Sequence, residues 1–556
     1  MKIMTKFVLG AVLFPCILGL TSAQAAPTGV QIVQQIGTVF VIAMENHNFV
    51  QPNPVGSPQQ IFTNPAAPFI NSLITPGNSN SVHVSYATRY YAAGTGVHPS
   101  EPNYIWAEAG TDFGVHTDND PSAGSGNVFT APHLTGQLNA AGIPWKNYQE
   151  DVQFSPQPIS NVTGTSGTEI NPYYHTGQYS YAPKHNPMCF FTDTATQNVY
   201  PLANLTQDLA NNTVGRYNWI TPNQYNDQHS SLNGGFTYHG TNFVSDQASI
   251  AQGDNFLSII IPQIMASQAW RSNGVIIIWT DETEGGDGTN YNLLEIAISP
   301  LAKGNAYASP VVMSHSSDIK TVEEIFGLSF LANAIPAAET SATGGYNNVA
   351  TVNDLSDFFQ PMPKIGVQQP ASYNLTNGSS TVNFGSVNLA SSFTNTFTLT
   401  NSGLATLTLT NFTLAGANPG DFTVSGISLP ASIATNASAT FKVAFSPAAA
   451  GPRSATLQIT NSDSSLNPFT LTLAGTGVGN NPPVLSGKFT AGSGSFQLSF
   501  NAPSGQPYRL LGTTNISQPL ASWTVLSSGT VSSNPVVYTD TTATNLTRRF
   551  YCLVSP

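Results

Sequence analysis

Polar side chains follow two apolar runs of the chain, at the point where each run ends. Glu45 and Asn46 follow VFVIAM, and Asp281 and Glu282 follow VIIIWT. Carboxylate and amide oxygens are ligands that divalent cations accept in proteins. If the two runs are parallel strands of one sheet, their carboxyl ends meet at the edge where such sheets bind ligands. The two pairs therefore predict a site for a divalent metal ion, although each pair alone is more often a helix cap or a solvated loop.

Ser100 lies between two prolines, Pro99 and Pro102, which restrict the backbone on both sides. This bracketing predicts a stiff loop that exposes the serine to solvent, either as a tight turn or as a presented nucleophile. A serine hydroxyl is a poor nucleophile unless a base or a metal ion lowers its pKa. A divalent cation does this and also balances charge on phosphoryl oxygens. Ser100 and the two acidic pairs together indicate cleavage of an anionic ester.

Histidines occur in several polar segments of the same region: His98, His185 in KHNP, His229 in NDQH and His315 in SHSSD. Imidazoles can donate hydrogen bonds to phosphate oxygens or protonate a leaving alcohol. Each of these histidines, taken singly, is more often structural than functional. Their joint occurrence with Ser100 and the acidic pairs favours an active site.

The composition narrows the class of protein. Only 8% of the 556 residues are charged, so the surface must be built mainly from Asn, Ser, Thr and Gln, which suits an exported protein. The net charge is −12 with 16 basic residues, which argues against a nucleic-acid partner.

The N-terminal segment has the features of a secretory signal. Two lysines precede an apolar run, and AQA then supplies small residues for cleavage after Ala25. The apolar run is short for a membrane anchor, so we expect a signal peptide over 1–25 and no transmembrane span in the mature chain. The protein should then be secreted, to the periplasm or beyond the cell. Of the three cysteines, Cys16 lies inside this segment. Cys189 and Cys552 lie beyond it, and the sequence leaves open whether they pair.

Apolar strand patterns alternate with helical patterns over residues 26–362. This alternation predicts an α/β domain with a mainly parallel sheet and helices on both faces. The elements expected are strands over 36–46 and 273–286 and helices over 133–143 and 316–328, the last capped by Ser317 and ended by Gly327.

Short alternating strands rich in Thr, Ser and Asn follow, with turn residues about every ten positions. This pattern predicts a β-sandwich over 370–478 and a further small β-rich module over 484–556. Neither segment carries a convincing catalytic set. We expect them to act as spacers, or to contact a polysaccharide or a cell surface; a stabilising appendage is an equal alternative.

Six motifs resemble those of a known family, in the same order, over residues 36–330. VFVIAMENHNF resembles the opening motif of the bacterial and fungal phosphoesterase family, which contains phospholipases C and acid phosphatases and is similar to the alkaline phosphatase superfamily. HPSEPNYIWAEAG resembles its acid-phosphatase branch, and KHNP, ITPNQYNDQH, IIIWTDETEGGD and SHSSDIKTVEEIFGL follow. The segment 374–478 resembles immunoglobulin-like domains of secreted bacterial proteins and of the ASPM/HYDIN group.

The resemblance implies a role for each matching residue. The metal ligands would be Glu45, Asn46, Asp281, Glu282 and the nucleophile Ser100 itself. Asn103 would support the loop or a phosphate oxygen, and His185 of the His-Asn-Pro motif would bind the substrate. Asp227, His229 and His315 lie at positions that bind a second metal ion or contact the phosphate. One departure concerns the loop after the second acidic pair. Thr283 and Glu284 precede Gly285, where the family has glycine at once. We therefore expect one metal site and leave a second open.

The sequence thus predicts a secreted, metal-dependent hydrolase of phosphoric esters that forms a phosphoserine on Ser100. His229 or His315 would protonate the leaving alcohol. An acid-phosphatase-like phosphomonoesterase acting on small phosphate esters is the first expectation. A phospholipase C-type phosphodiesterase is the alternative, favoured if the site opens into an apolar groove. A catalytically inactive extracellular adhesion protein is the alternative from another class.

Overall fold

A computed structural model describes most of the chain. The residues described are 26–93, 96–119, 121, 127–152, 162–163, 179–331, 352–479, 483–490, 495–503 and 505–555. The expected signal peptide, residues 1–25, lies outside them. None of the helices in the described part is both long enough and apolar enough to cross a membrane.

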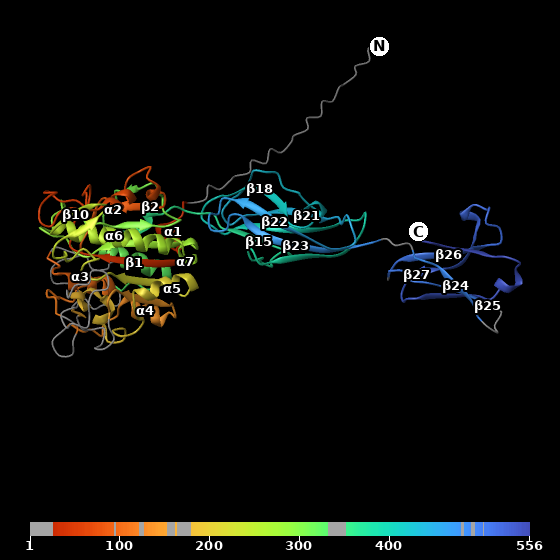
Figure 1. The fold of residues 1–556 in the computed structure, drawn as a ribbon, viewed down its shortest axis with the longest axis horizontal. Helices are drawn as coiled ribbons and strands as arrows, with labels where there is room; N and C mark the ends of the chain where they lie inside the picture. The colour runs from red at the N-terminus through yellow and green to blue at the C-terminus, as the bar shows by residue number, and fades with distance from the viewer. Residues whose placement is uncertain are drawn as a thin grey trace, which may run out of the picture.

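The first domain is built on one eight-stranded sheet (Figure 1). In spatial order its strands are β13 (Tyr307–Ser309), β2 (Val84–Ala87), β12 (Ile296–Ile298), β11 (Gly274–Thr280), β1 (Thr38–Met44), β8 (Tyr217–Thr221), β4 (Trp145–Gln149) and β7 (Val199–Pro201). The strands from β11 to β7 run parallel, whereas β12 is antiparallel to both of its neighbours. The expected α/β class is confirmed, with a sheet that is mixed at one side.

Both faces of this sheet are buried, which explains the unbroken apolar runs in its central strands. In β1, Val39, Val41 and Ala43 belong to the core on one face. Phe40, Ile42 and Met44 belong to the core on the other face. A strand that is solvated on one face would instead have alternated apolar with polar residues.

Helices cover both faces of the sheet, as expected. On one face lie α1 (Gly29–Val33), α3 (Ser100–Ala109), α4 (Leu134–Ala140) and α8 (His315–Phe326); on the other lie α2 (Pro68–Leu73), α5 (Ala203–Asn211), α6 (Asp246–Met265) and α7 (Gln268–Arg271). Helix α8 ends at Gly327 with φ 66°, as the sequence suggested. Its N-cap is Ser314, not Ser317, whose hydroxyl instead accepts a hydrogen bond from the Ser314 backbone N–H. The expectation was off by one turn because either serine can accept from a free N–H at a helix start.

Short strands outside the main sheet complete the domain. They are β3 (Tyr90–Tyr91) with β14 (Met313–Ser314), β9 (Phe236–Tyr238) with β10 (Thr241–Phe243), and β5 (Val162–Thr163) with β6 (Tyr179–Tyr181).

A β-sandwich follows, as expected from the alternating pattern. One sheet holds β15 (Ile365–Gln368), β17 (Phe393–Asn401), β21 (Ser438–Phe445) and β19 (Phe422–Ser425); the other holds β16 (Thr381–Asn388), β23 (Phe469–Val478), β22 (Gly451–Asn461), β18 (Leu407–Ala415) and β20 (Ala431–Ile433). Because β15 pairs with β17, the sandwich begins at Ile365, ahead of the boundary expected at residue 370.

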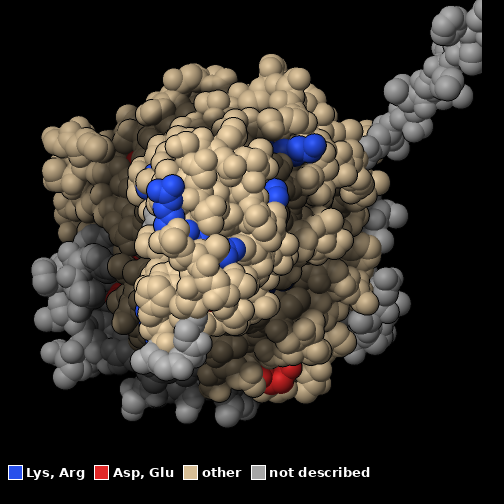
Figure 2. Space-filling view, turned by 90° about the vertical axis from the view of Figure 1, so that its right-hand side faces the viewer, with Lys and Arg blue, Asp and Glu red and all other residues tan. Residues whose placement is uncertain are grey.

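Two three-stranded sheets form the C-terminal module. They are β24 (Ser486–Thr490), β25 (Ser495–Phe500) and β28 (Val536–Asp540), and β27 (Thr524–Thr530), β26 (Pro507–Thr513) and β29 (Phe550–Val554). Figure 2 faces this end of the chain and shows several Lys and Arg side chains with little acidic surface. Cys189 and Cys552 are both free thiols in this structure.

Candidate active site

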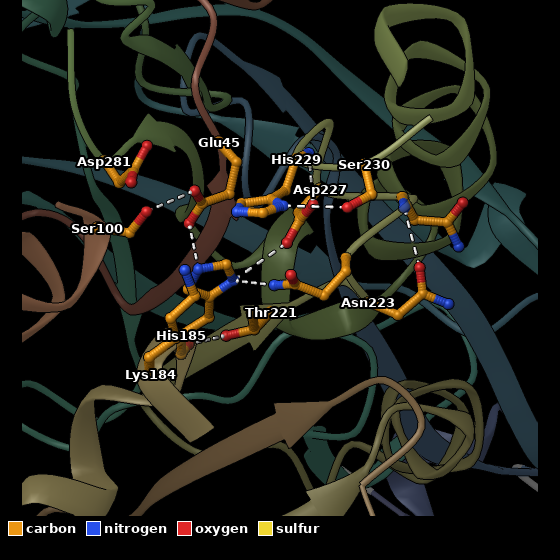
Figure 3. A network of polar contacts seen from close by, with 12 residues as sticks. Glu45, Ser100, Lys184, His185, Thr221, Asn223, Asp227, His229, Ser230 and Asp281 are labelled. Carbon is orange, nitrogen blue, oxygen red and sulfur yellow. Dashed lines mark hydrogen bonds and ion pairs between the residues drawn. The ribbon is translucent and has the colours of Figure 1, made fainter. Parts of the chain in front are cut away.

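Acidic residues from three neighbouring strands meet at one edge of the main sheet (Figure 3). Glu45 follows β1 and Asp281 follows β11, while Asp227 lies in the segment after β8. The Glu45 N–H donates to the Asp227 carbonyl at 2.8 Å, and the Asp281 N–H donates to the Met44 carbonyl at 3.1 Å. These backbone bonds hold the ends of parallel strands together at the edge where open α/β sheets bind ligands.

Asn46 has a conformation that suits its residue type. Its φ is 56°, a left-handed region that asparagine enters more readily than most residues. This turn lets the Asn46 N–H donate to Asp281 Oδ1 at 3.1 Å. The structure thereby brings the two predicted ligand pairs together, although they are separated by 235 positions.

Ser100 is not in an exposed loop, contrary to expectation. It is the first residue of α3, and its side chain is buried at 2% exposure. Pro102 fits the first helical turn because the N–H groups there have no partner within the helix. The Ser100 Oγ lies 3.1 Å from Glu45 Oε2 and 3.0 Å from Glu282 Oε1. The proline bracketing therefore starts a helix that turns the hydroxyl inward to the acidic edge.

Two of the predicted histidines join this group. His185 Nε2 lies 3.1 Å from Glu45 Oε1, and His185 Nδ1 lies 3.3 Å from Asp227 Oδ2. One ligand atom from each of Glu45, His185 and His229 lies within 4.8 Å of the others, a spacing at which a single metal ion can be shared. Burial lowers the pKa of His185 well below its usual value and that of His229 to about 4. Both rings are then neutral, the form that binds metals.

The acidic edge carries more negative charge than its surroundings compensate. Burial and then the charges of Asp281 and Asp227 raise the pKa of Glu45 well above its usual value. Burial and the charge of Glu282 raise the pKa of Asp281 to about 8. Buried carboxylates are stable only when paired or bound to a cation, so this edge is suited to bind a divalent ion.

Buried polar atoms without a hydrogen bond give an independent test of whether these residues suit a divalent ion. Asn46 Oδ1 and Asp281 Oδ2 are buried and make no hydrogen bond, and the buried His185 Nε2 has only its ion-pair contact with Glu45. All three are ligand atoms, and a mixed oxygen and imidazole set suits zinc and similar divalent ions better than calcium. The expected oxygen ligands are therefore joined by His185, and His229 lies within reach of the same ion. The sequence assigned His185 to the substrate, and His229 to proton donation, a second ion or the phosphate.

Two predicted residues lie outside this group. Asn103 Nδ2 donates to the Val97 carbonyl at 2.9 Å, so this side chain supports the segment before Ser100. His315 Nε2 lies 2.9 Å from the Thr280 carbonyl, and its ring packs against Trp279 at 4.7 Å. The structure does not bring His315 into contact with Ser100 or Glu45.

The sequence interpretation missed several residues that the fold adds to the site. The Tyr104 hydroxyl donates to Glu45 Oε1 at 2.7 Å, from a position one helical turn after Ser100. Lys184 pairs with Asp118 at 2.7 Å and lies beside His185 in Figure 3. Burial opposes its charge, but Glu45 and Asp118 raise the pKa of Lys184, so it stays a cation. Its position within KHNP was the signal that would have identified it.

His98 is a further addition, two residues before Ser100. Its hydrogen bond to Glu282 outweighs the effect of burial and raises the pKa of His98 to about 9. The sequence noted this histidine without giving it a place in the site.

Comparisons with known proteins agree with this arrangement. Residues 83–329 match the Phosphoesterase family, and residues 375–476 match the HYDIN/CFA65/VesB-like, Ig-like domain. A phosphatidylinositol-3-phosphatase of Mycobacterium tuberculosis is 24% identical over 331 residues, which are 58% of this chain and 92% of that protein. An acid phosphatase of Aspergillus fumigatus is 33% identical over 150 residues, which are 26% of this chain and 30% of that protein.

A solved protein of the alkaline phosphatase superfamily from Vibrio parahaemolyticus is 11% identical, covers 53% of this chain and 67% of its own, and has a TM-score of 0.33, too low to support a conclusion. The sequence matches confirm the family resemblance and the immunoglobulin-like domain, and they support a hydrolase of the phosphoesterase type. The chain spans less than a third of the Aspergillus protein.

Proposed function

We propose that this chain, whose residues 83–329 match the Phosphoesterase family, is a metal-dependent phosphomonoesterase with Ser100 as its nucleophile. The observation that carries the proposal is the position of the Ser100 hydroxyl. Its oxygen lies between Glu45 and Glu282, at 3.1 and 3.0 Å, at an edge where Asn46 Oδ1 and Asp281 Oδ2 make no hydrogen bond.

Different residues would bind the metal ion and compensate the charge of the phosphate. A divalent cation held by Glu45, Asn46, Asp281, Glu282 and His185 would lower the pKa of the serine hydroxyl and neutralise phosphoryl oxygens, which leaves His229 for proton transfer. Lys184 supplies a further positive charge beside the phosphate position.

The reaction would run in two displacements. Ser100 Oγ bonds to phosphorus while its proton passes to Glu282, and the alcohol leaves with a proton from His229. Water then cleaves the phosphoserine and releases inorganic phosphate. The low pKa of His229 confines this proton donation to acid pH. His315 is left out of the reaction because it does not reach Ser100.

The test is turnover of p-nitrophenyl phosphate by the full chain, with and without a chelator and with divalent metals restored. Ser100→Ala should lower kcat by at least about a thousandfold, whereas Ser249→Ala, a buried serine of the same domain that bonds the Asp246 carbonyl, should not. Acid-quenched protein should carry phosphate on Ser100. An inactive wild type with every metal tried would instead support the adhesion alternative.

A phospholipid phosphate is the second candidate substrate. A groove of about 270 Å³ runs between α5 and α6; it is lined mainly by apolar side chains, including Phe256, Ile259 and Ile260, and also by Asn226. Asn226 directly precedes Asp227 in the chain, which connects the groove lining to the segment that carries this site residue. The mycobacterial relative is named for a phosphatidylinositol phosphate. Higher kcat/KM for a dispersed lipid monophosphate than for p-nitrophenyl phosphate, lost in Ile259→Asp, would favour this candidate.

Contact of the C-terminal β domains with a polysaccharide or a cell surface stays a prediction. The last module contains Lys488, Arg509, Arg548 and Arg549 but a single acid, Asp540. This excess of positive charge would favour an anionic surface. Secretion also stays a prediction, tested by the N-terminus of the protein recovered from the producing cells.

A further inference from the structure

His98 links two carboxylates that lie in the same loop. Its Nδ1 contacts Glu282 Oε2, and its Nε2 lies 2.8 Å from Asp287 Oδ1. Glu282 in turn accepts from Ser100 through its other oxygen, Oε1. A continuous row of contacts therefore runs from Asp287 through His98 and Glu282 to the nucleophile.

Asp287 is itself fixed from two further directions. The Gly96 N–H and the Thr283 hydroxyl each donate to this carboxylate at 2.9 Å. The loop returns to His98 through Gly285 and Gly286, whose φ values of 81° and 154° suit glycine. A Cβ at Gly286 would lie 2.8 Å from the Tyr291 ring, so a larger residue there would also have to displace that side chain.

The two residues inserted before the glycines, the departure from the family pattern, help to support this loop. Thr283 and Glu284 are the two residues that separate the acidic pair from the glycines. The Thr283 hydroxyl is one of the groups that hold Asp287, so the longer loop supplies part of its own support.

We propose that Asp287 and Thr283 are positioning residues that act through His98 to hold Glu282 with Oε1 directed at Ser100. Because His98 occupies Oε2, Glu282 has only Oε1 to offer to the serine or to a cation. Without this support Glu282 gains rotamers that point away, and a misplacement of about 1 Å at such a site costs on the order of a hundredfold in rate. The inference rests on the proposed function for its catalytic consequence, but not for its geometric part.

The competing interpretation is that the same contacts only connect two loops and stabilise the fold. Their loss would then lower folding stability and leave the orientation of Glu282 unchanged. Orientation and stability are measured separately, so the two interpretations can be distinguished.

The experiment uses Thr283→Val and Asp287→Asn in the full chain, with Asp357→Asn as a matched control. Asp357 is a comparably exposed carboxylate of the same domain that accepts from Ser309 at 2.6 Å and pairs with Lys303, far in sequence from the site loops. The readouts are kcat and KM for p-nitrophenyl phosphate, zinc affinity of the chelator-treated protein followed by tryptophan fluorescence, and the melting temperature.

Asp287→Asn should lower kcat and zinc affinity by about 10- to 100-fold each, as loss of a group supporting a ligand does. KM should stay within about twofold, because substrate binding groups are untouched. Thr283→Val should give a smaller loss in the same direction, and Asp357→Asn should change neither quantity.

Unchanged kcat and zinc affinity in both loop variants would overturn the inference, as would losses matched by Asp357→Asn. Zinc affinity of the apo protein is measured without turnover. If the wild type hydrolyses nothing, a weaker zinc affinity in Asp287→Asn still supports the positioning role while the proposed function fails.

Discussion

Buried acids in the sandwich have basic or N–H partners, whereas buried acids at the sheet edge of the first domain lie beside other acids. In the sandwich, Asp421 is 4% exposed and pairs with Arg453 at 2.5 Å. Asp463, 3% exposed, accepts from the Ile365 and Ser465 N–H groups, both at 3.0 Å. At the sheet edge of the first domain, Glu45 and Asp281 are fully buried beside one another, and the charge of each is opposed by further acids.

The unpartnered atoms show the same contrast. Among the described residues, every buried side-chain nitrogen or oxygen that lacks a hydrogen bond belongs to the first domain. A buried acid that serves only the fold is neutralised by a base or by backbone N–H groups, because an uncompensated charge is costly. Asp281 is one of the first-domain acids with such an atom, and it lies at the sheet edge where the geometry suits a ligand.

The largest expected effect comes from Asp281→Asn. It removes a ligand atom and a negative charge without changing shape, so kcat should fall by about a thousandfold or more while the metal-free protein becomes more stable. Turnover and the melting temperature in chelator measure the two effects. Loss of activity together with a lower metal-free melting temperature would mean that Asp281 stabilises the fold, which would remove the contrast with Asp421.

A smaller effect, a loss of folding stability, is expected from Arg453→Met. It leaves Asp421 buried without its base, which should cost about 3 kcal/mol of sandwich stability. The turnover of the first domain should be unchanged. Scanning calorimetry with limited proteolysis of the sandwich, alongside p-nitrophenyl phosphate turnover, tests both statements. An altered kcat would show that the sandwich contributes to the site.

The smallest effect is a pH dependence of the folding stability of the metal-free protein. Asp281 has a folded pKa of about 8, above its unfolded value, so the folded state holds a proton that the unfolded state loses. Stability from this group is present below about pH 4 and is lost as the pH rises to about 8. The melting temperature in chelator should fall by about 3 °C or more between pH 5 and 8.

Two comparisons check that expectation. Asp281→Asn should reduce the slope, because its amide does not titrate, and added zinc should abolish it. A melting temperature in chelator that is flat over this range, or that rises, would contradict the raised pKa.

The elements of the fold were largely predictable. The apolar runs at β1 and β11 and the helical spacing at α4 and α8 depend on neighbours within one or two turns, so a local pattern suffices to identify them. The same locality explains why Glu45 and Asp281 were placed at strand ends. The antiparallel strand β12 was not foreseen, because strand direction depends on the path of the chain between strands.

The site was predictable in its members more than in its geometry. Proline bracketing pointed to Ser100, a polar segment to His185 and the family motifs to Asp227, whereas the inward direction of the Ser100 hydroxyl required the helix start and the neighbouring strands to be in place. His315 was expected at the site on its motif, but its ring faces Thr280. Tyr104 and Lys184 had no signal apart from their neighbours.

By itself the sequence determined which segments are strands and helices, where acids follow strands and which family the motifs resemble, because each of these depends on residues close together in the chain. The motifs suggested that Ser100 and Glu282 share a metal ion, but only the tertiary structure decided that they touch directly, across 182 positions, and that His98 meets Asp287 across 189. Contacts of that separation are set by strand order and loop path, which no local pattern encodes.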